Sequence, residues 1–264
     1  MSRGILFLMY HELQAMGREL CESDPGYVRY VVTADEFRDH LTMFQANNWR
    51  GLNVTESLRL ISGSNEQAEK GVCLTFDDGC ATDLLVAAPL LQEKCFNATF
   101  YITVDHLGRR GYLTEEQLQE LSKLGFEIGS HSMTHRYLDD LGPDDLRLEI
   151  AESKKRLEQM TGKAVTHFSC PGGRVNSRVI QIAREAGYDS VATSRIGINN
   201  SGTDRFALRR VAVKQGTTSD KLERLCRGEG QLLGQAQNAV LAGAKRVLGN
   251  ATYERLRSTV LRQG

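Results

Sequence analysis

Segments typical of strands and of helices alternate along most of this chain, and this alternation constrains its fold more than any other feature. Short apolar or β-branched runs mark strands, and apolar residues at helical spacing mark helices. The expected strands cover residues 5–10, 72–76, 98–104, 126–129, 165–170, 190–193 and 206–213. The alternation indicates an α/β fold with a mostly parallel sheet. A distorted (β/α) barrel fits the length, and a doubly wound open sheet is the alternative that periodicity does not separate from it.

Capping patterns predict where several helices begin. Thr33 with Glu36, and Thr114 with Gln117, have the spacing of a capping box, so helices are expected directly after Thr33 and Thr114. Further helices are expected at 82–93, 143–160 and 176–186. Pro89 predicts a kink or an early end in the first of these, because proline lacks the backbone N–H that a helix interior needs.

Length and charge restrict the class of protein. The 264 residues suit one large domain, or one domain with a small appendage. The 33 basic and 33 acidic side chains cancel, so the chain lacks the basic excess typical of nucleic-acid binders and no nucleic acid is expected as a partner.

The cysteines and the N-terminus bear on the expected compartment. Six cysteines are scattered along the chain without a CxxC pair, which favours free thiols and a reducing compartment. The apolar run at 5–9 is too short for a signal peptide, and no segment approaches the about 20 apolar residues of a membrane span. These features predict a cytoplasmic protein.

The C-terminal part has a different composition. Residues 221–264 contain eight Lys or Arg against three Glu, with leucines and valines at helical spacing. This pattern predicts two amphipathic helices with a basic face. They could form a helical cap packed on the domain, or an element that associates with a membrane surface or a partner.

Two adjacent carboxylates directly follow an expected strand. In LTFDDG, residues 74–79, Asp77 and Asp78 come at the carboxyl end of the strand, where α/β folds build their sites. Neighbouring carboxylates repel each other, and a bound cation at one would leave the other as a base. A plain Asp-Asp-Gly turn is the alternative reading.

Two histidines follow another expected strand. His131 and His135, in IGSHSMTH at 128–135, are four residues apart, and on a helical turn this spacing puts both imidazoles on one face. Two imidazoles with one carboxylate and open positions for water suit Zn²⁺ or another transition metal in a hydrolytic role. Surface histidines without a ligand are the alternative.

A third strand ends in Pro171, Gly172 and Gly173, within HFSCPGGR at 167–174. Glycines let a backbone approach a ligand closely, so an N–H of Gly172 or Gly173 could donate to a developing oxyanion. The alternative is a tight turn.

Together these segments resemble the polysaccharide deacetylase family, also known as the NodB-homology domain or carbohydrate esterase family 4. The resemblance covers roughly residues 4–215, and LTFDDG and HSMTH correspond to the family's first two motifs. It implies a distorted (β/α)7 TIM-like barrel, a catalytic domain at 1–217 and a helical extension at 218–264. It also implies Asp77 as the catalytic base and Asp78, His131 and His135 as ligands of a divalent metal, Zn²⁺ first, with Co²⁺, Ni²⁺ or Fe²⁺ as alternatives.

The chain departs from the family pattern in two places. The third motif usually has an arginine that pairs with the base, and Ser169 stands at that position; Arg174 is a candidate to replace it. The late Leu-x-x-His motif that supplies the general acid is missing, and the corresponding segment reads ALRRVAV. Arg209 and Arg210, in that segment, are expected to orient the acid or to contact substrate.

A branch of the family resembles this chain at its N-terminus. Exopolysaccharide deacetylases take the acid histidine from a first strand that ends in Tyr-His, and this chain has Tyr10 and His11 there. His11 is therefore the expected general acid, with a merely hydrogen-bonded histidine as the alternative. His40, His106 and His167 are expected to be structural or surface residues.

The expected function is metal-dependent removal of N-acetyl groups from an amino-sugar glycan or glycan precursor in surface-polysaccharide biosynthesis. A basic tail could hold such an enzyme at the inner face of an anionic membrane. A non-sugar amide substrate and a carbohydrate-binding pseudoenzyme remain as alternatives, and the sequence determines neither the exact sugar nor the oligomeric state.

Overall fold

A mostly parallel sheet forms the centre of the molecule. The computed structural model describes residues 4–63 and 70–229. In this part of the chain the main sheet has nine strands. They are β1 (Ile5–Tyr10), β4 (Arg50–Leu52), β5 (Gly71–Phe76), β6 (Thr99–Ile102), β7 (Glu127–Ser130), β8 (His167–Ser169), β9 (Ser190–Ala192), β10 (Ile198–Asn199) and β11 (Val211–Ala212). A separate parallel pair joins β2 (Leu13–Gln14) to β3 (Val32–Thr33).

The strand order distinguishes a barrel from an open doubly wound sheet. The path runs β10-β1-β5-β6-β7-β8-β9, so the parallel strands follow one another in chain order without the reversal that a doubly wound sheet has. Leu208 bridges Ala192 of β9 in parallel, and β11 pairs in parallel with β1. Residues 208–212 therefore contact both edges of the parallel series. The sheet curls into the distorted barrel that the family resemblance predicts.

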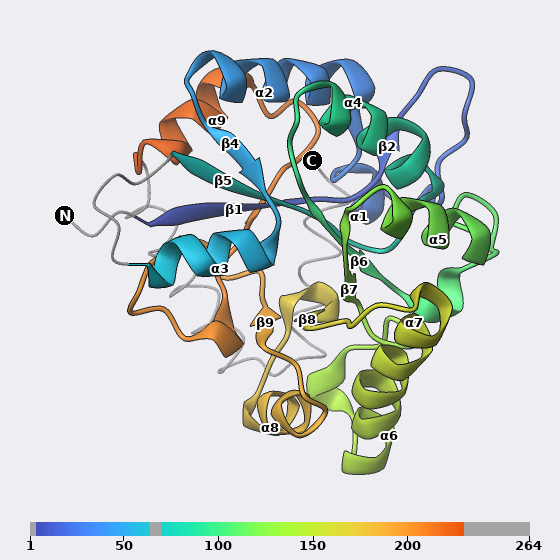
Figure 1. Ribbon diagram of the computed structural model, residues 1–264. Helices are drawn as coiled ribbons and strands as arrows, with labels where there is room; N and C mark the ends of the chain where they lie inside the picture. The colour runs from blue at the N-terminus through green and yellow to red at the C-terminus, as the bar shows by residue number, and fades with distance from the viewer. Residues whose placement is uncertain (1–3, 64–69, 230–264) are drawn as a thin grey trace.

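Helices surround the sheet on its outside (Figure 1). They are α1 (Pro25–Val28), α2 (Ala34–Ala46), α3 (Val54–Ser62), α4 (Ala88–Glu93), α5 (Glu115–Lys123), α6 (Pro143–Arg147), α7 (Ser153–Thr161), α8 (Ser177–Glu185) and α9 (Ser219–Cys226). Thr33 and Thr114 cap α2 and α5 through complete capping boxes, as the sequence predicts.

Two predicted helices contain a wider, π-helical turn. Residues Asp83–Ala87 form such a turn before α4, and Leu148–Glu152 form another between α6 and α7. In the first, the N–H of Ala88 donates to the carbonyl of Asp83, five residues back. Pro89 follows immediately and has no N–H to donate, so the kink expected at Pro89 takes the form of this turn.

Some predicted strands are longer than the observed ones. The segment expected at 98–104 is a strand only over β6, and the one expected at 206–213 only over β11. A 3-10 turn at Arg205–Ala207 occupies the start of the latter, because the chain must bend there to pass from β9 to β1.

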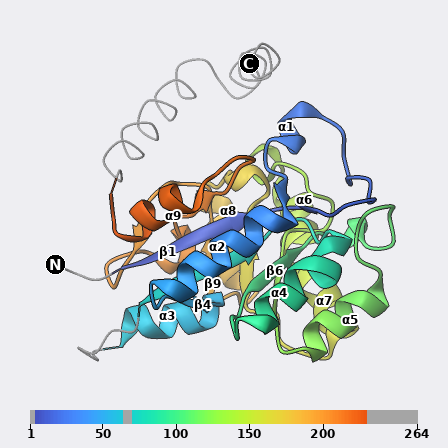
Figure 2. The same cartoon turned by 90° about the horizontal axis from the view of Figure 1, so that it is seen from above.

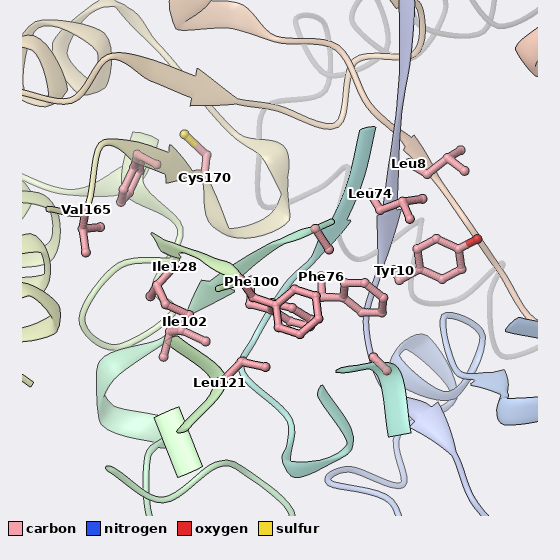
Figure 3. Packing of buried hydrophobic residues seen from close by; sticks show 14 of the residues in the cluster. Leu8, Tyr10, Leu74, Phe76, Phe100, Ile102, Leu121, Ile128, Val165 and Cys170 are labelled. Carbon is pink, nitrogen blue, oxygen red and sulfur yellow. The ribbon is translucent and has the colours of Figure 1, made fainter. Parts of the chain in front are cut away.

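Aromatic residues from neighbouring strands stack inside the sheet. Phe76 lies between Tyr10 and Phe100, with ring centroids 5.3 and 4.8 Å away (Figure 3). All six residues of β1 are buried, as expected for a strand covered on both faces. The hydroxyl of Tyr10 lies 3.2 Å from Nδ1 of His40, whose Nε2 donates to the carbonyl of Thr217 at 2.7 Å. His40 thus has the structural position predicted for it.

The chain beyond the barrel begins with a helix that packs on it. In α9, which lies beside β1 and α2 (Figure 2), Leu222 is fully buried. Thr218 is the N-cap of α9, so the helix begins where the helical extension is predicted to begin. The two amphipathic helices expected within 221–264 lie mostly outside the described residues, and the division at 217 stays a prediction. None of the described helices has the length and apolar character required to cross a membrane.

Candidate active site

The residues singled out by the sequence gather at the carboxyl ends of the parallel strands. Asp77 and Asp78 follow β5, His131 follows β7, and His11 follows β1. The N–H of Asp77 donates to the carbonyl of Tyr10 at 3.0 Å, which continues the β1–β5 ladder into the site. Since strands in a parallel barrel end on the same face, side chains far apart in the sequence meet there.

Asp78, His131 and His135 converge with the geometry of a metal site. Oδ1 of Asp78 lies 3.5 Å from Nε2 of His131 and 3.2 Å from Nε2 of His135. One ligand atom from each residue lies within 4.8 Å of the others. Oδ1 of Asp78 is buried without a hydrogen-bond partner, and it faces the two ring nitrogens. A divalent cation fits this donor set.

The protonation of His131 matches the same interpretation. Its Nδ1 donates to the carbonyl of Ser169 at 2.8 Å, which leaves the lone pair on Nε2 directed at Asp78. Burial lowers the pKa of His131 to about 4, against the opposing effect of Asp77. His131 is therefore neutral at physiological pH, the form in which imidazole binds a metal.

Asp78 stays ionised for a different reason. Burial alone would raise the pKa of its carboxyl group, but contact with His135 and the nearby charges of His11 and His131 hold that pKa well below its usual range. Asp78 therefore offers a carboxylate to a cation at neutral pH.

The histidines do not share a helical turn, and the prediction of one was wrong. Residues 131–135 form an irregular loop in which Ser132 and His135 have φ of 70° and 65°. This left-handed conformation is rare for residues other than glycine. Asp78 also has a positive φ, 83°, so strained backbone occurs on both sides of the candidate metal site.

A buried carboxylate that the sequence analysis missed holds this loop. Glu149 accepts hydrogen bonds from the backbone N–H groups of Met133 and Thr134 at 3.0 and 2.9 Å. The N–H of His135 donates to Oγ of Ser132 at 3.1 Å. Glu149 comes from the π-helical turn at Leu148–Glu152, and no local pattern links it to the HSMTH segment.

Asp77 is paired with Arg210. Nη1 of Arg210 donates to Oδ1 at 2.7 Å, and Nη2 donates to Oδ2 at 2.8 Å. The remaining N–H groups of this guanidinium donate to Thr75 Oγ1 at 3.2 Å, Ser169 Oγ at 2.7 Å and the Thr193 carbonyl at 3.1 Å. Burial alone would raise the pKa of Asp77, but Arg210 and His131 lower it below its usual value.

These contacts correct the roles expected for the arginines. Arg210 is 1% exposed and all five of its N–H groups donate to groups of the protein, so none is left to donate to a substrate. Arg174 does not reach Asp77, since it forms ion pairs with Asp139 and Asp140 at 2.6 and 2.7 Å. Arg209 reaches the carbonyl of Ile198 at 3.5 Å.

Arg210 therefore forms the pair with Asp77 that the family resemblance led us to expect from an arginine of the third motif. Ser169, which occupies that motif position, accepts from Arg210 and donates to Oδ2 of Asp77 at 3.2 Å. The sequence contained one signal for this pairing, which was Arg210 inside the apolar strand expected at 206–213. Such an arginine is rarely buried without a charged partner.

The glycines after β8 are held by close contacts. A Cβ on Gly173 would lie 2.0 Å from Oγ of Ser194, and one on Gly172 would lie 2.7 Å from Cε1 of Tyr137. The N–H of Gly173 already donates to the carbonyl of Cys170 at 2.7 Å, and Pro171 has no N–H. Of the three residues, Gly172 is the one left to donate to an oxyanion.

Two further histidines lie near the candidate metal site. His11 packs against Tyr30 with ring centroids 5.0 Å apart, its Nδ1 is buried without a hydrogen-bond partner, and its charge contributes to the lowered pKa of both Asp77 and Asp78. His106, expected to be structural or at the surface, has its ring centroid 5.7 Å from that of His135, and burial lowers its pKa to about 4.

Known proteins share both the sequence pattern and the fold. The model of the polysaccharide deacetylase family matches residues 64–191. YxkH of Bacillus subtilis, named for the same family, is 31% identical over 209 residues, which are 79% of this chain and 71% of that protein. The peptidoglycan-N-acetylglucosamine deacetylase of Bacillus cereus is 35% identical over 127 residues, 48% of this chain and 57% of the relative.

Among solved structures, the deacetylase PplD of Streptococcus pyogenes superposes with a TM-score of 0.75 at 25% identity, over 85% of this chain and 98% of PplD. The superposition on PplD agrees with the barrel. This chain belongs to the polysaccharide deacetylase family, whose members are hydrolases of N-acetyl amide bonds.

Proposed function

We propose that this protein is a metal-dependent hydrolase that removes N-acetyl groups from an amino-sugar glycan or glycan precursor used in surface-polysaccharide biosynthesis. The observation that carries the proposal is the position of an ionised carboxylate, Asp77, beside the ligand set Asp78, His131 and His135. Oδ2 of Asp77 lies 3.8 Å from Nε2 of His131, so a water at the ligand set is within reach of Asp77.

Asp77 acts as the general base. Its lowered pKa keeps it ionised at neutral pH, and its two hydrogen bonds from Arg210 fix the carboxylate in one orientation. It takes a proton from the attacking water, as a positioned base must. Arg210 is then a positioning residue, because its N–H groups contact the base and not the substrate.

Asp78, His131 and His135 would hold the metal, and two imidazoles with one carboxylate favour Zn²⁺, with Co²⁺, Ni²⁺ or Fe²⁺ as alternatives. When bound, such an ion supplies Lewis-acid polarisation of the acetyl carbonyl and lowers the pKa of a bound water. The carbonyl of Ser169 orients His131 for this task by accepting from Nδ1.

His11 delivers a proton to the leaving amine. His11 directly follows β1, and its Nδ1 is buried without a hydrogen-bond partner. The N–H of Gly172 donates to the oxyanion that forms during attack. A base and a separate acid are needed because the water must lose a proton while the nitrogen gains one.

The substrate class follows from the relatives. The matched Bacillus cereus protein is a deacetylase of peptidoglycan N-acetylglucosamine, and PplD was solved in complex with acetate, the small product of deacetylation. These names support an N-acetylated amino sugar as substrate. A position at the inner face of an anionic membrane, through basic residues within 221–264, is part of the proposal.

The test is acetate release from N-acetylglucosamine oligomers by metal-stripped protein, with and without added Zn²⁺, Co²⁺ or Ni²⁺. We expect release only with metal, and loss of release in Asp77→Asn while that variant still binds metal. Asp77→Asn with undiminished turnover would remove Asp77 from the mechanism. Metal binding without release from any glycan would favour a non-sugar amide, and failure to bind metal would favour a carbohydrate-binding pseudoenzyme.

A further inference from the structure

A second group of ligating side chains lies beside the candidate active site. Oxygen of Glu12 and the sulfurs of Cys21 and Cys80 all lie within 4.8 Å of one another. Glu12 and Cys80 are buried and Cys21 is partly buried. None of the three belongs to the set formed by Asp78 and the two histidines.

Three separate parts of the chain form this group. Glu12 comes directly after His11, Cys21 lies in the segment between β2 and α1, and Cys80 follows Asp78 and Gly79. The backbone N–H of Cys21 donates to the carboxylate of Glu12, at 2.9 Å to Oε2 and 3.3 Å to Oε1. These bonds orient the carboxylate beside the two sulfurs, and Oε1, which accepts only the longer of them, keeps a further lone pair.

The other polar contacts of the group come from Tyr27 and Gly111. The hydroxyl of Tyr27 donates to Oε2 of Glu12 at 2.8 Å and lies 3.4 Å from Sγ of Cys80. The thiol of Cys21 donates to the carbonyl of Gly111 at 3.0 Å. The described side chains therefore bring thiols, a carboxyl and a phenol together, and no cationic side chain hydrogen-bonds to Glu12 or to either sulfur.

Asp83 is a further buried carboxyl group near this set. Its side chain is fully buried, and neither carboxylate oxygen has a hydrogen-bond partner. Burial, Cys21 and the carboxylates of Asp78 and Glu12 raise its pKa well above the usual value, so Asp83 lies within electrostatic range of both this group and the active site. A buried carboxyl group without a partner is costly, and proteins usually compensate it with a counter-charge or a metal.

We propose that Cys21, Cys80 and Glu12 bind a structural divalent cation of the zinc class, separate from the metal of the active site. Two thiolates select Zn²⁺ and similar ions over Mg²⁺ and Ca²⁺, which prefer sets of oxygen ligands. Each thiol loses a proton to solvent as its bond to the metal forms, and no oxidation or reduction takes place.

The position of this cation implies a positioning role. It would tie the segment that carries His11 and Glu12 to the loop that carries Asp78 and Cys80. Metal binding at the thiolates does not depend on the proposed deacetylase function. The role of the cation in positioning His11 as the general acid rests on that function.

Cobalt separates the two metal sites, because thiolate ligands give Co²⁺ a sulfur-to-metal charge-transfer band in the near ultraviolet and imidazoles and carboxylates do not. The experiment uses the full chain, reduced, stripped of metal and titrated with Co²⁺ without oxygen. We expect the band in the unaltered protein and in Asp78→Asn, which removes a ligand of the other site. We expect it to disappear in Cys21→Ser and in Cys80→Ser, each of which binds one ion fewer than the unaltered chain.

Cys95→Ser is the matched control, since Cys95 is an exposed thiol outside the group, and it should retain the band and the full metal content. Glu12→Gln keeps both thiols and should weaken cobalt binding at this site, which preserves the test if a cysteine variant does not fold. Cobalt binding without the band, or a band that survives Cys21→Ser or Cys80→Ser, would overturn the proposal.

Discussion

Arg210 donates one hydrogen bond to each carboxylate oxygen of Asp77, at 2.7 and 2.8 Å, in a site where both side chains are almost fully buried. Bidentate pairs of this kind are stronger and more directional than single contacts. The pair joins the end of β5 to the segment that closes the barrel between β9 and β1. Closure of the fold and orientation of the proposed base therefore depend on the same interaction.

Arg210→Gln should raise the pKa of Asp77, because it removes the cation that lowers it. As the pH falls, Asp77 would then become protonated at a higher pH than in the unaltered protein. The acid limb of the kcat/KM profile should therefore shift to higher pH. Loss of one partner of a buried pair should also cost about 3–5 kcal/mol of stability. Acetate release from pH 4 to 9 and urea unfolding measure the two effects.

Arg210→Lys and Arg209→Gln complete this experiment. Lysine keeps the charge and loses the bidentate geometry, so its acid limb should lie between those of the unaltered protein and Arg210→Gln. Arg209 precedes Arg210 and bonds to the Ile198 carbonyl, so Arg209→Gln should leave the profile unchanged. An unmoved acid limb in Arg210→Gln would contradict the positioning role.

Gly173→Ala should destabilise the protein by more than its backbone conformation alone requires. Both Gly173 and Gly125 have a positive φ, 67° and 94°, which costs alanine about 1–2 kcal/mol at either position. At Gly173 the new Cβ would also lie 2.0 Å from Oγ of Ser194, whereas nothing lies within 4 Å at Gly125. Overpacking adds about 1–3 kcal/mol at Gly173 only.

Urea unfolding of Gly173→Ala and Gly125→Ala gives the difference between these two costs. Equal losses of unfolding free energy would show that the contact between the loop after β8 and Ser194 relaxes without cost. In that case the packing of Gly173 would give no reason to expect that the N–H of Gly172 is held rigidly.

Much of the fold and part of the site can be predicted from local patterns. The capping boxes at Thr33 and Thr114 place two helices, because side chain and backbone bond within four residues. Asp77, Asp78 and His131 each come directly after a buried strand, and parallel strands bring such positions to one face. Their meeting in space follows from the order of the strands, although their chemical roles remain predictions.

Other parts of the site depend on contacts that no local pattern records. Arg210 reaches Asp77 only because residues 208–212 close the barrel, so sequence separation hides the pair. The spacing of His131 and His135 suggested a helical turn, but positive φ values at Ser132 and His135 produce the convergence instead. Tertiary contacts impose such conformations, and here the contacts come from Glu149. The loop therefore differs from the helical turn that the spacing of the histidines suggested.

Glu149→Gln should weaken metal binding although Glu149 does not contact the ligand atoms. Its Oε2 accepts from the N–H groups of Met133 and Thr134, and its Oε1 accepts from the hydroxyl of Thr134. An amide puts an NH2 donor in the place of one of these two acceptors. The loop that carries His131 and His135 should then relax, and loss of such support typically reduces metal affinity by about 10–100-fold. Competition with a chelator measures the dissociation constant.

Glu152→Gln is the control for this prediction. Glu152 belongs to the same π-helical turn but forms ion pairs with Lys155 and Arg156, away from the loop, so metal affinity should stay near that of the unaltered protein. If both variants bind metal as tightly as the unaltered chain, the positive-φ loop holds its conformation without Glu149.

His11→Ala should lower kcat for N-acetylglucosamine oligomers by about 100-fold to 10,000-fold, the usual contribution of a general acid. Metal content should not change, because the ligand set is Asp78, His131 and His135. An acetyl ester with a good leaving group needs no proton from His11, so its hydrolysis should survive in His11→Ala and be lost in Asp77→Asn. Equal losses on the amide and on the activated ester would mean that His11 shapes the site without transferring the proton.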